Sequence, residues 1–307
     1  MLGERAAILG LSRQGRSSPG GACQLLETAD GFIALNLARD SDRDLLPAWL
    51  EQWAVTSEQL EPMVHRETTA DLLARARALG LAVSPMSAPK PCPKWFHEAL
   101  SSEKQLPVSA QPLVVDLSSL WAGPLCAQLL ADCGARVIKV ESTERPDGAR
   151  SGSTEFYNLL NAGKESVAFN LSSEEGRKQL LDLLQQADIV IEASRPRALV
   201  QMGIRAEELV AARPGKVWLS ITGYGRDAPM CDWVAFGDDA GVAAGLSWLV
   251  GGNKKDPVFC GDAIADPLTG LHAALLALAS WQSGGGKLFD VSLHDVVAFC
   301  IAAGAVQ

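Results

Sequence analysis

Several residue patterns that mark common protein classes are missing from this chain of 307 residues. The seven cysteines are scattered, odd in number and include no C-x-x-C pair, so neither a disulfide framework nor a zinc site is indicated and reduced thiols are expected. Only four histidines occur, and none belongs to an H-E-x-x-H pattern. We therefore expect no metal site.

Basic runs and long apolar runs are missing too. Lys and Arg total 27 against 36 Asp and Glu, a formal net charge of −9, which argues against a nucleic-acid surface. The apolar stretch VVAFCIAAGAV (residues 296–306) is too short to cross a bilayer, and the first residues lack a signal-peptide core. We expect a cytoplasmic protein that binds neither nucleic acid nor membrane. Its length and its 48% hydrophobic residues suffice for two domains with real cores.

Proline marks a boundary within the chain. Six of the sixteen prolines fall between Pro85 and Pro112, so residues 85–111 read as a linker, with a short helix expected at residues 94–100. Residues 1–84 alternate between strand-like and helix-like patterns and predict a small α+β domain. The strand DGFIALNLA (residues 30–38) and the helix TTADLLARARALG (residues 68–80) are its clearest elements.

Residues 112–307 predict an α/β domain, because short apolar strands alternate with helical segments. Ser172 and Glu175 have capping-box spacing before one such helix. We expect an open, Rossmann-like parallel sheet with helices on both faces. Its strands are expected at LVVDL (113–117), RVIKVE (136–141), SVAFNL (166–171), DIVIEA (188–193), KVWLSIT (216–222) and KLFDVSL (287–293).

Ligands of such sheets bind beyond the carboxyl ends of the strands. The loops there read SSLWAGP, SRPRAL and GYGRDAP. None has the G-x-G-x-x-G fingerprint after a strand, and no P-loop pattern occurs, so an NAD-dependent dehydrogenase and a P-loop enzyme are poorly supported. The pattern alone indicates an α/β protein with a nucleotide-sized site.

A carboxylate precedes the longest apolar helix, in GDAIADPLTGLH (residues 261–272). Asp266 followed by Pro267 is typical of a helix start, with Asp as the N-cap and Pro at the first helical position. Capping alone would account for Asp266. The positive helix end would also keep its carboxylate ionised, which suits a nucleophile.

These segments resemble the family III CoA-transferases, which include formyl-CoA and carnitine CoA-transferases and the α-methylacyl-CoA racemases. The resemblance covers nearly all of residues 112–300, through VVDLSSLWAGP, NLLNAGKESVAFNL, SITGYGRDAP, GDAIADPLTGLH and SGGGKLFDVSLHD, in the family's order. It implies a Rossmann-like large domain with a small domain, assembled as an interlocked homodimer. Coenzyme A would be a substrate, passed from an acyl-CoA donor to a carboxylic-acid acceptor, with no permanently bound cofactor.

The resemblance also implies site residues. Asp266 matches the family's catalytic aspartate, which attacks the donor thioester to give a mixed anhydride and then an aspartyl-CoA thioester, whereas Asp262 lies outside that position and reads as loop polarity. The residues implied to bind CoA are Leu120, Trp121, Ala122, Arg195, Gly223 and Tyr224.

Three of the loop residues also have a purely structural interpretation. Trp121 could simply pack, Arg195 could be a solvated loop cation, and Lys164 is expected at the surface, positioning a turn. Where the family commonly has Asn-Phe before Arg-Pro and an Arg a few residues later, this chain has Ala193, Ser194 and Gln201. Losing a cationic phosphate partner there would weaken CoA binding.

Two further departures keep other functions open. The racemase branch uses a His in the loop where this chain has Phe236 followed by Asp238 and Asp239, so an acyl-CoA racemase or isomerase using Asp266 as base ranks second. We also expect the small domain to come first in this chain, at residues 1–84, whereas the family places it after the large one. Either the order is permuted or the chain is part of a tandem completed by a partner chain, and a non-catalytic acyl-CoA-binding subunit is the third hypothesis.

Overall fold

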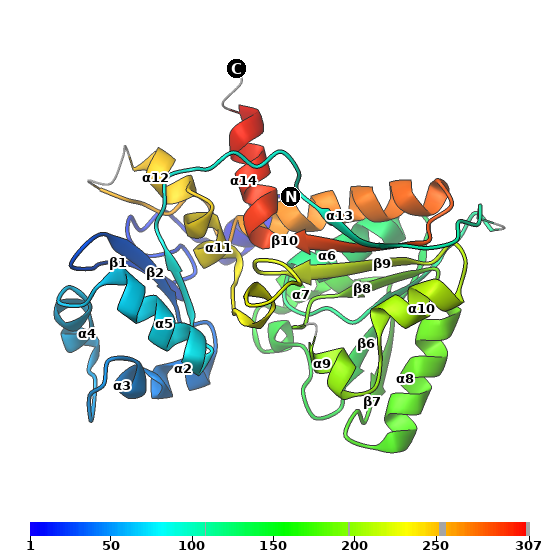
Figure 1. Ribbon diagram of the computed structural model, residues 1–307, viewed down its shortest axis with the longest axis horizontal. Coiled ribbons are helices and arrows are strands. Elements are labelled where there is room, and N and C mark those ends of the chain that lie inside the picture. Colours follow the sequence, from blue (N-terminus) through cyan, green and yellow to red (C-terminus); the bar gives the residue numbers. More distant parts are fainter. Residues whose placement is uncertain (108, 196, 252–255, 305–307) are drawn as a thin grey trace. The chain divides into compact units, whose positions relative to one another are not determined.

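The computed structural model describes residues 1–107, 109–195, 197–251 and 256–304, and the chain forms two compact units. The first unit comprises Met1–Trp95, Asp227–Asp266 and Leu293–Gln307, and the second comprises Phe96–Arg226 and Pro267–Ser292. Each unit contains one β-sheet (Figure 1). The α/β class predicted from the sequence is confirmed: a seven-stranded, mostly parallel sheet flanked by helices accompanies a small antiparallel sheet near the N-terminus.

The first unit is built on a three-stranded antiparallel sheet. Its strands are β1 (Cys23–Glu27), β2 (Phe32–Asn36) and β3 (Ala82–Pro85), in that order. Its helices are α1 (Glu4–Leu9), α2 (Asp40–Asp44), α3 (Leu46–Trp49), α4 (Ser57–Val64), α5 (Thr69–Leu79), α11 (Gly237–Ala243), α12 (Leu246–Val250) and α14 (Leu293–Gly304), with a 3-10 turn η2 (Met230–Asp232).

Both faces of this small sheet are covered. Successive side chains of a strand point to opposite faces, and in β2 Ile33 and Leu35 enter a core with the helices α3, α4 and α5. Ala34, on the other face, packs with Val242 of α11 and with Phe259. The segment that carries α11 is distant in sequence but completes the second face, and it thereby becomes part of this unit.

The second unit has the strand order β4-β10-β9-β8-β5-β6-β7. The strands are β4 (His97–Ser101), β5 (Leu113–Asp116), β6 (Arg136–Ser142), β7 (Glu165–Phe169), β8 (Ile189–Glu192), β9 (Val217–Thr222) and β10 (Lys287–Ser292). The helices are α6 (Ala122–Asp132), α7 (Thr154–Asn161), α8 (Glu174–Gln186), α9 (Arg197–Gln201), α10 (Ala206–Ala212) and α13 (Ala265–Gln282), with a 3-10 turn η1 (Gly148–Ser151).

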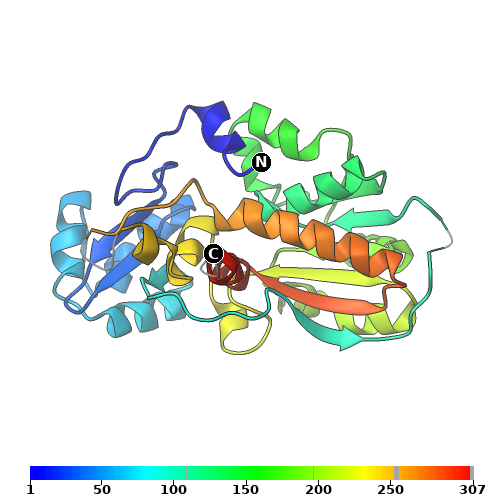
Figure 2. The ribbon, with the colours of Figure 1, turned by 90° about the horizontal axis from the view of Figure 1, so that it is seen from above.

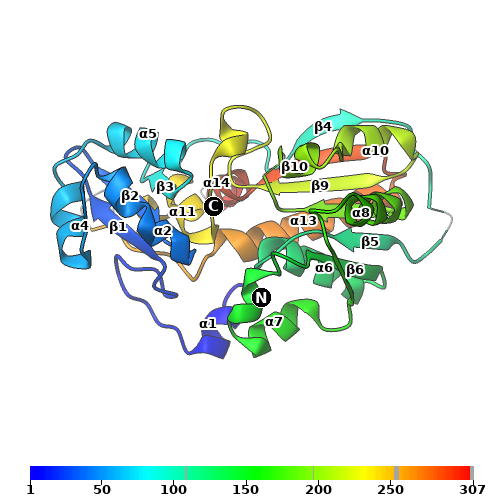
Figure 3. The ribbon, with the colours of Figure 1, turned by 90° about the horizontal axis from the view of Figure 1, so that it is seen from below.

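Helices cover the large sheet on two sides. Leu184 of α8 and Val210 of α10 pack with Trp218 of β9 in one core, and both helices lie in front of the sheet in Figure 1. Figure 3 shows α6, α7 and α13 grouped together. The helix α13 packs closely on α6, because a side chain at Gly270 would meet the backbone oxygen of Ala122 at 2.7 Å.

Two local predictions were wrong. Residues 94–100, expected to be helical, include the start of β4, which pairs antiparallel with β10 at the sheet edge (Figure 2) because that edge offers backbone partners. The N-cap of α8 is Ser173, not Ser172: the Ser173 hydroxyl accepts a hydrogen bond from the backbone N–H of Gly176. Among the described residues, no helix is both long and apolar enough to cross a membrane.

Candidate active site

The strand order of the second unit defines where a ligand would bind. After β5 the chain continues to β6 and β7 on one side, and β8, β9 and β10 then follow on the other side. The neighbours β5 and β8 are parallel, so their carboxyl ends meet at one edge at the point where the order reverses. The loop after β5 carries Leu120 and Trp121, and the loop after β8 carries Arg195. The structure therefore brings these two predicted loops to the switch point.

Leu120 and Trp121 differ in what their side chains do. Leu120 is 42% exposed and has a left-handed backbone with φ of 69°. Trp121 is buried and meets the ring of Phe156 edge-on, with centroids 5.1 Å apart, so it packs in the interior. Ala122 is buried too and begins α6. Of the three, Leu120 presents the accessible side chain.

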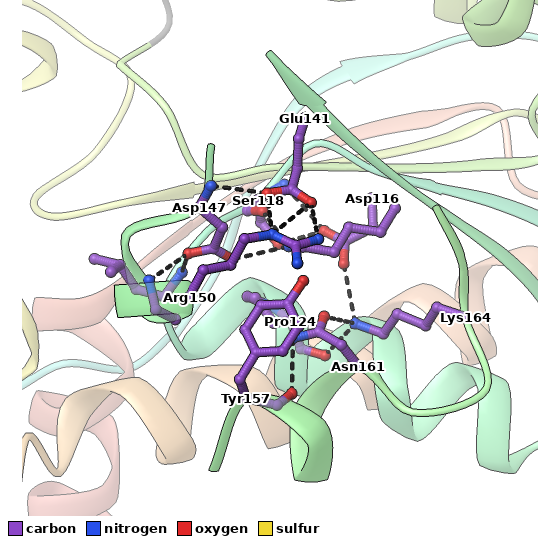
Figure 4. A network of polar contacts seen from close by, with 12 residues as sticks. Asp116, Ser118, Pro124, Glu141, Asp147, Arg150, Tyr157, Asn161 and Lys164 are labelled. Carbon is purple, nitrogen blue, oxygen red and sulfur yellow. Dashed lines mark hydrogen bonds and ion pairs between the residues drawn. The ribbon is translucent and has the colours of Figure 1, made fainter. Parts of the chain in front are cut away.

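A network of buried charges lies next to this loop (Figure 4). The ammonium of Lys139, on β6, lies 2.9 Å from a carboxylate oxygen of Asp147, and both side chains are almost fully buried. Burial alone would lower the pKa of Lys139, but the carboxylates of Asp116 and Asp147 outweigh it and raise that pKa. The ammonium is therefore charged at neutral pH. Glu141 forms a paired contact with Arg150, whose guanidinium lies over the ring of Tyr157.

Lys164 is part of the same network, and the prediction that it lies at the surface was wrong. Its side chain is 1% exposed, and its ammonium lies 3.1 Å from Asp116. It also donates to the backbone oxygen of Pro124 and to the side-chain oxygen of Asn161. Burial lowers the pKa of Lys164, opposed by the Asp116 carboxylate. Asp116 in turn accepts hydrogen bonds from the backbone and hydroxyl of Ser118, which shapes the loop after β5.

The loop after β9 is fixed by a second buried network. Gly223 and Tyr224 precede Gly225, whose φ of 117° favours glycine and whose N–H donates to the Thr222 hydroxyl. The next residue, Arg226, donates to Glu192 at the end of β8 at 2.7 Å. Its backbone N–H also bonds to a β10 carboxylate. These contacts hold the predicted Gly223-Tyr224 segment beside the loop after β8.

Arg195 lies in the loop after β8. Its side chain is exposed, as are Ala193, Ser194 and Gln201, the positions at which the chain departs from the family pattern. An exposed cation at this edge could meet a ligand phosphate, although screening by salt would weaken the contact.

Asp266 belongs to the first unit and is half-buried. The prediction that it is the N-cap was wrong by a small margin: α13 begins at Ala265, so Asp266 lies within the first turn. The positive end of the helix still favours its anionic form. A side chain at Gly237, the first residue of α11, would meet a carboxylate oxygen of Asp266 at 2.2 Å. The missing side chain at Gly237 thus leaves the room that the Asp266 carboxylate occupies.

The neighbouring aspartates hold the backbone around Asp266. Asp238 accepts a hydrogen bond from the N–H of Ala263 at 2.8 Å. Asp262 is buried and pairs with Arg5 at 2.7 Å, so its reading as loop polarity was wrong. Asp239 caps α11 by accepting from the N–H of Phe236. Each of these three aspartates therefore has a structural role, as a hydrogen-bond acceptor or as an ion-pair partner.

Burial changes how two of these acids titrate. It raises the pKa of Asp238 to about 6 and that of Asp239 to about 7. Asp239 accepts a further hydrogen bond from the side-chain amide of Asn36. The titration of both groups therefore falls close to the neutral range.

Other kinds of site find no support in the described part of the chain. Within it, no group of three or more His, Cys, Asp or Glu side chains could hold a metal ion. An open hollow of about 550 Å³ in the first unit is lined by the β1–β2 turn, Thr69 and Met86. None of the residues predicted to act in catalysis or CoA binding lines this hollow.

The strand order and the loops at its reversal define a doubly wound α/β protein, a class whose ligands bind at the carboxyl edge of the sheet. The sequence model of CoA-transferase family III matches residues 110–307, well over half of the chain, and the chain belongs to this family. The resemblance seen in the sequence is thereby confirmed.

Characterised relatives are CoA-transferases. The chain is 33% identical over 195 residues to the succinyl-CoA–D-citramalate CoA-transferase of Chloroflexus aurantiacus, covering 60% of this chain and 48% of that protein. It is 31% identical over 206 residues to the succinate–glutarate CoA-transferase of Agrobacterium fabrum, covering 62% and 52%. The chain thus spans about half the length of the curated relatives it matches.

A solved structure shows the same fold. The crystal structure of a CaiB/BaiF family protein from Brucella suis is 30% identical, with a TM-score of 0.57. The similarity covers 64% of this chain and 55% of that one.

Proposed function

We propose that this protein moves coenzyme A between carboxylic acids, with Asp266 as the nucleophile. One observation carries the proposal: in a member of this family, the Asp266 carboxylate lies half-buried in the first turn of α13, against the bare backbone of Gly237. The helix end favours the ionised carboxylate, and partial burial limits its hydration. Such a carboxylate is suited to attack a thioester.

The proposed reaction has four balanced steps. The Asp266 carboxylate attacks the donor thioester, which forms a mixed anhydride and expels CoA thiolate. The thiolate attacks the aspartyl carbonyl and releases the donor acid, leaving an aspartyl-CoA thioester. The acceptor carboxylate opens that thioester to a second mixed anhydride and frees the thiolate again. The thiolate then attacks the acceptor carbonyl, which gives the new acyl-CoA and restores the carboxylate.

The CoA portion would bind at the carboxyl edge of the large sheet. We propose that Leu120, with Trp121 and Ala122 behind it, borders the nucleotide and pantetheine path, and that Gly223 and Tyr224 flank the pantetheine. The position of these two loops beside the switch point supports this assignment. Arg195 would meet a phosphate from the loop after β8, as an exposed cation at that edge.

Names of the relatives suggest the substrate class. Proteins similar to this chain are named for the pairs succinyl-CoA with D-citramalate and succinate with glutarate. We propose a short dicarboxylic acyl-CoA as donor and a short carboxylic acid as acceptor. Two other relatives are named as the alpha and beta subunits of a succinyl-CoA–L-malate CoA-transferase. Assembly as a homodimer or with a partner chain is therefore part of the proposal.

Trapping the aspartyl thioester tests the reaction. The purified protein is incubated with succinyl-CoA, treated with or without hydroxylamine, and analysed by intact mass and peptide mapping. We expect a CoA adduct that hydroxylamine converts to a hydroxamate at Asp266, absent from Asp266→Ala and present in Asp227→Asn, which changes an exposed aspartate of the same unit. Exchange of an α-proton in heavy water without an adduct would point to a racemase instead. CoA binding with neither result would point to a non-catalytic subunit.

A further inference from the structure

The loop after β5 is held at two backbone atoms by one buried ion pair. The Lys139 ammonium donates to the backbone oxygen of Ser118 at 3.0 Å. The Leu120 N–H donates to a carboxylate oxygen of Asp147, also at 3.0 Å. Because Lys139 and Asp147 are paired at 2.9 Å, the two contacts act as one clamp across three residues of the loop.

The clamped residue has a conformation that leucine rarely adopts. The φ of Leu120 is 69°, in the left-handed region that is unfavourable for residues with a side chain. Its side chain is 42% exposed, so packing does little to offset the cost. Such a conformation persists only where the surroundings impose it. The hydrogen bond to Asp147 is the contact that restrains the Leu120 backbone directly.

Asp147 is itself fixed in place before it meets the loop. Its backbone N–H donates to Glu141 of β6 at 2.8 Å. The oxygen that accepts from Leu120 also accepts from the N–H of Ala149, which caps the turn η1. The other carboxylate oxygen faces Lys139. The carboxylate therefore transmits the position of a rigid strand to the loop.

We propose that Asp147 and Lys139 are positioning residues for CoA binding, which hold Leu120 in the left-handed conformation that the loop needs to accept the ligand. The inference rests on the proposed function, because it assigns the loop after β5 to CoA. It adds a requirement for backbone geometry. The loop after β5 binds CoA only when the Asp147 side chain, from the loop after β6, holds the Leu120 backbone. Neither positioning residue is required to touch CoA.

The first test is a double-mutant cycle. One variant removes the restraint on the Leu120 backbone, and the other removes the conformational strain at that position. Asp147→Ala removes the acceptor for the Leu120 N–H, and Leu120→Gly makes the left-handed conformation inexpensive. By titration calorimetry with CoA, we expect Asp147→Ala to weaken binding about tenfold in the parent chain and no more than about threefold in the Leu120→Gly background. Steady-state kinetics should show a raised KM for the acyl-CoA, with kcat and the acceptor KM little changed.

A control variant at the amino ends of the strands separates an effect on loop position from an effect on overall stability. Asp188 makes the same two kinds of contact as Asp147: it accepts from the backbone N–H of Leu113 at 2.8 Å and pairs with Arg213 at 2.6 Å. It lies at the amino ends of the strands, away from the proposed CoA edge. Asp188→Ala should lower the unfolding temperature and leave the Kd for CoA unchanged.

A second pair of variants keeps the proposal testable if Asp147→Ala does not fold. Leu120→Ile keeps the size of an accessible apolar side chain, but β-branched residues are strongly disfavoured at positive φ. We expect it to bind CoA at least about fivefold more weakly than Leu120→Met does.

The outcomes divide cleanly. Equal binding by the Ile and Met variants, or an Asp147→Ala effect that is as large in the Leu120→Gly background, would overturn the positioning role. A parent chain that binds no CoA would instead contradict the proposed function. A loss of affinity in Asp188→Ala as large as in Asp147→Ala would reduce the clamp to ordinary stabilisation.

Discussion

Replacing Gly237 by alanine places a methyl group where the Asp266 carboxylate now lies. The added carbon would sit 2.2 Å from a carboxylate oxygen of Asp266 and 2.4 Å from the backbone oxygen of Ala263, each about 1 Å or more inside the 3.4 Å at which ordinary contact begins. Rotation of the Asp266 side chain could relieve the first clash. It could not relieve the second, so the backbone that leads into α13 must shift.

The size of the effect follows from that displacement. Misplacing a reacting group by about 1 Å costs on the order of 100-fold in rate, so Gly237→Ala should lower kcat by about two orders of magnitude. Overpacking typically destabilises by about 1–3 kcal/mol. Transfer from succinyl-CoA would be followed by chromatography of the acyl-CoA products, and stability by urea unfolding.

A glycine one turn further along α11 provides the control. A side chain at Gly241 would meet Ile264 at 3.5 Å, which is ordinary contact. Gly241→Ala should therefore keep its activity and gain up to about 1 kcal/mol from better helix propensity. If Gly237→Ala retained kcat within about threefold, the packing of Gly237 against the Asp266 carboxylate would not matter for catalysis.

Three further predictions concern pH, buried charge and the exposed cation. Because burial raises the pKa of Asp239 to about 7, the folded state retains a proton that the unfolded state releases near pH 4, so stability should fall by roughly 2–4 kcal/mol between pH 4 and 7. Urea midpoints at several pH values should show this slope, and Asp239→Asn should reduce it, leaving the contribution of Asp238, whose pKa burial raises to about 6. Lys164→Met should destabilise by about 3 kcal/mol because it leaves Asp116 buried without its ammonium partner, whereas Arg136→Met, at an exposed pair, should change urea stability by less than about 1 kcal/mol. Arg195→Gln should weaken CoA binding about threefold at low salt in calorimetry, a difference that about 0.5 M salt should abolish.

The central parallel strands β5, β8 and β9 could be predicted from the sequence because they are buried on both faces. Such strands appear as mostly apolar runs, as in β8 (Ile189–Glu192) and β9 (Val217–Thr222), where every residue is buried. The edge strand β4 (His97–Ser101) could not, since its residues are mostly exposed and carry no apolar alternation. Its pairing with β10 gives it a strand conformation, and no local pattern encodes that pairing.

Which segments join which compact unit was also hard to predict, because the contacts involved are distant in sequence. The boundaries at residues 1–84, 85–111 and 112–307 remain a prediction for the functional domains. The compact units group the chain differently, because Val242 of α11 helps to cover the second face of the small sheet. A seven-residue helix more than 140 residues away gives no local sign of that contact.

Only one of the three residues of the clamp on Leu120 could be recognised from the sequence. Lys139 stands inside the apolar run RVIKVE, where a charged side chain on a buried strand requires a partner. The partner could not be identified by spacing, since Asp147 reaches Lys139 through the turn after β6. The left-handed φ of Leu120 had no signal at all, because a glycine would normally mark that position.

Two buried lysines, Lys139 and Lys164, pair with the carboxylates of Asp147 and Asp116 around the carboxyl end of β5. The Asp188 pair at the opposite end of that strand is about one-third exposed. Buried ion pairs seldom stabilise a fold more than well-packed apolar side chains would. Stability alone therefore does not explain why the fully buried pairs lie at this edge. Their contacts to the loop after β5 explain this location, because directional hydrogen bonds fix backbone atoms in a way that apolar packing cannot.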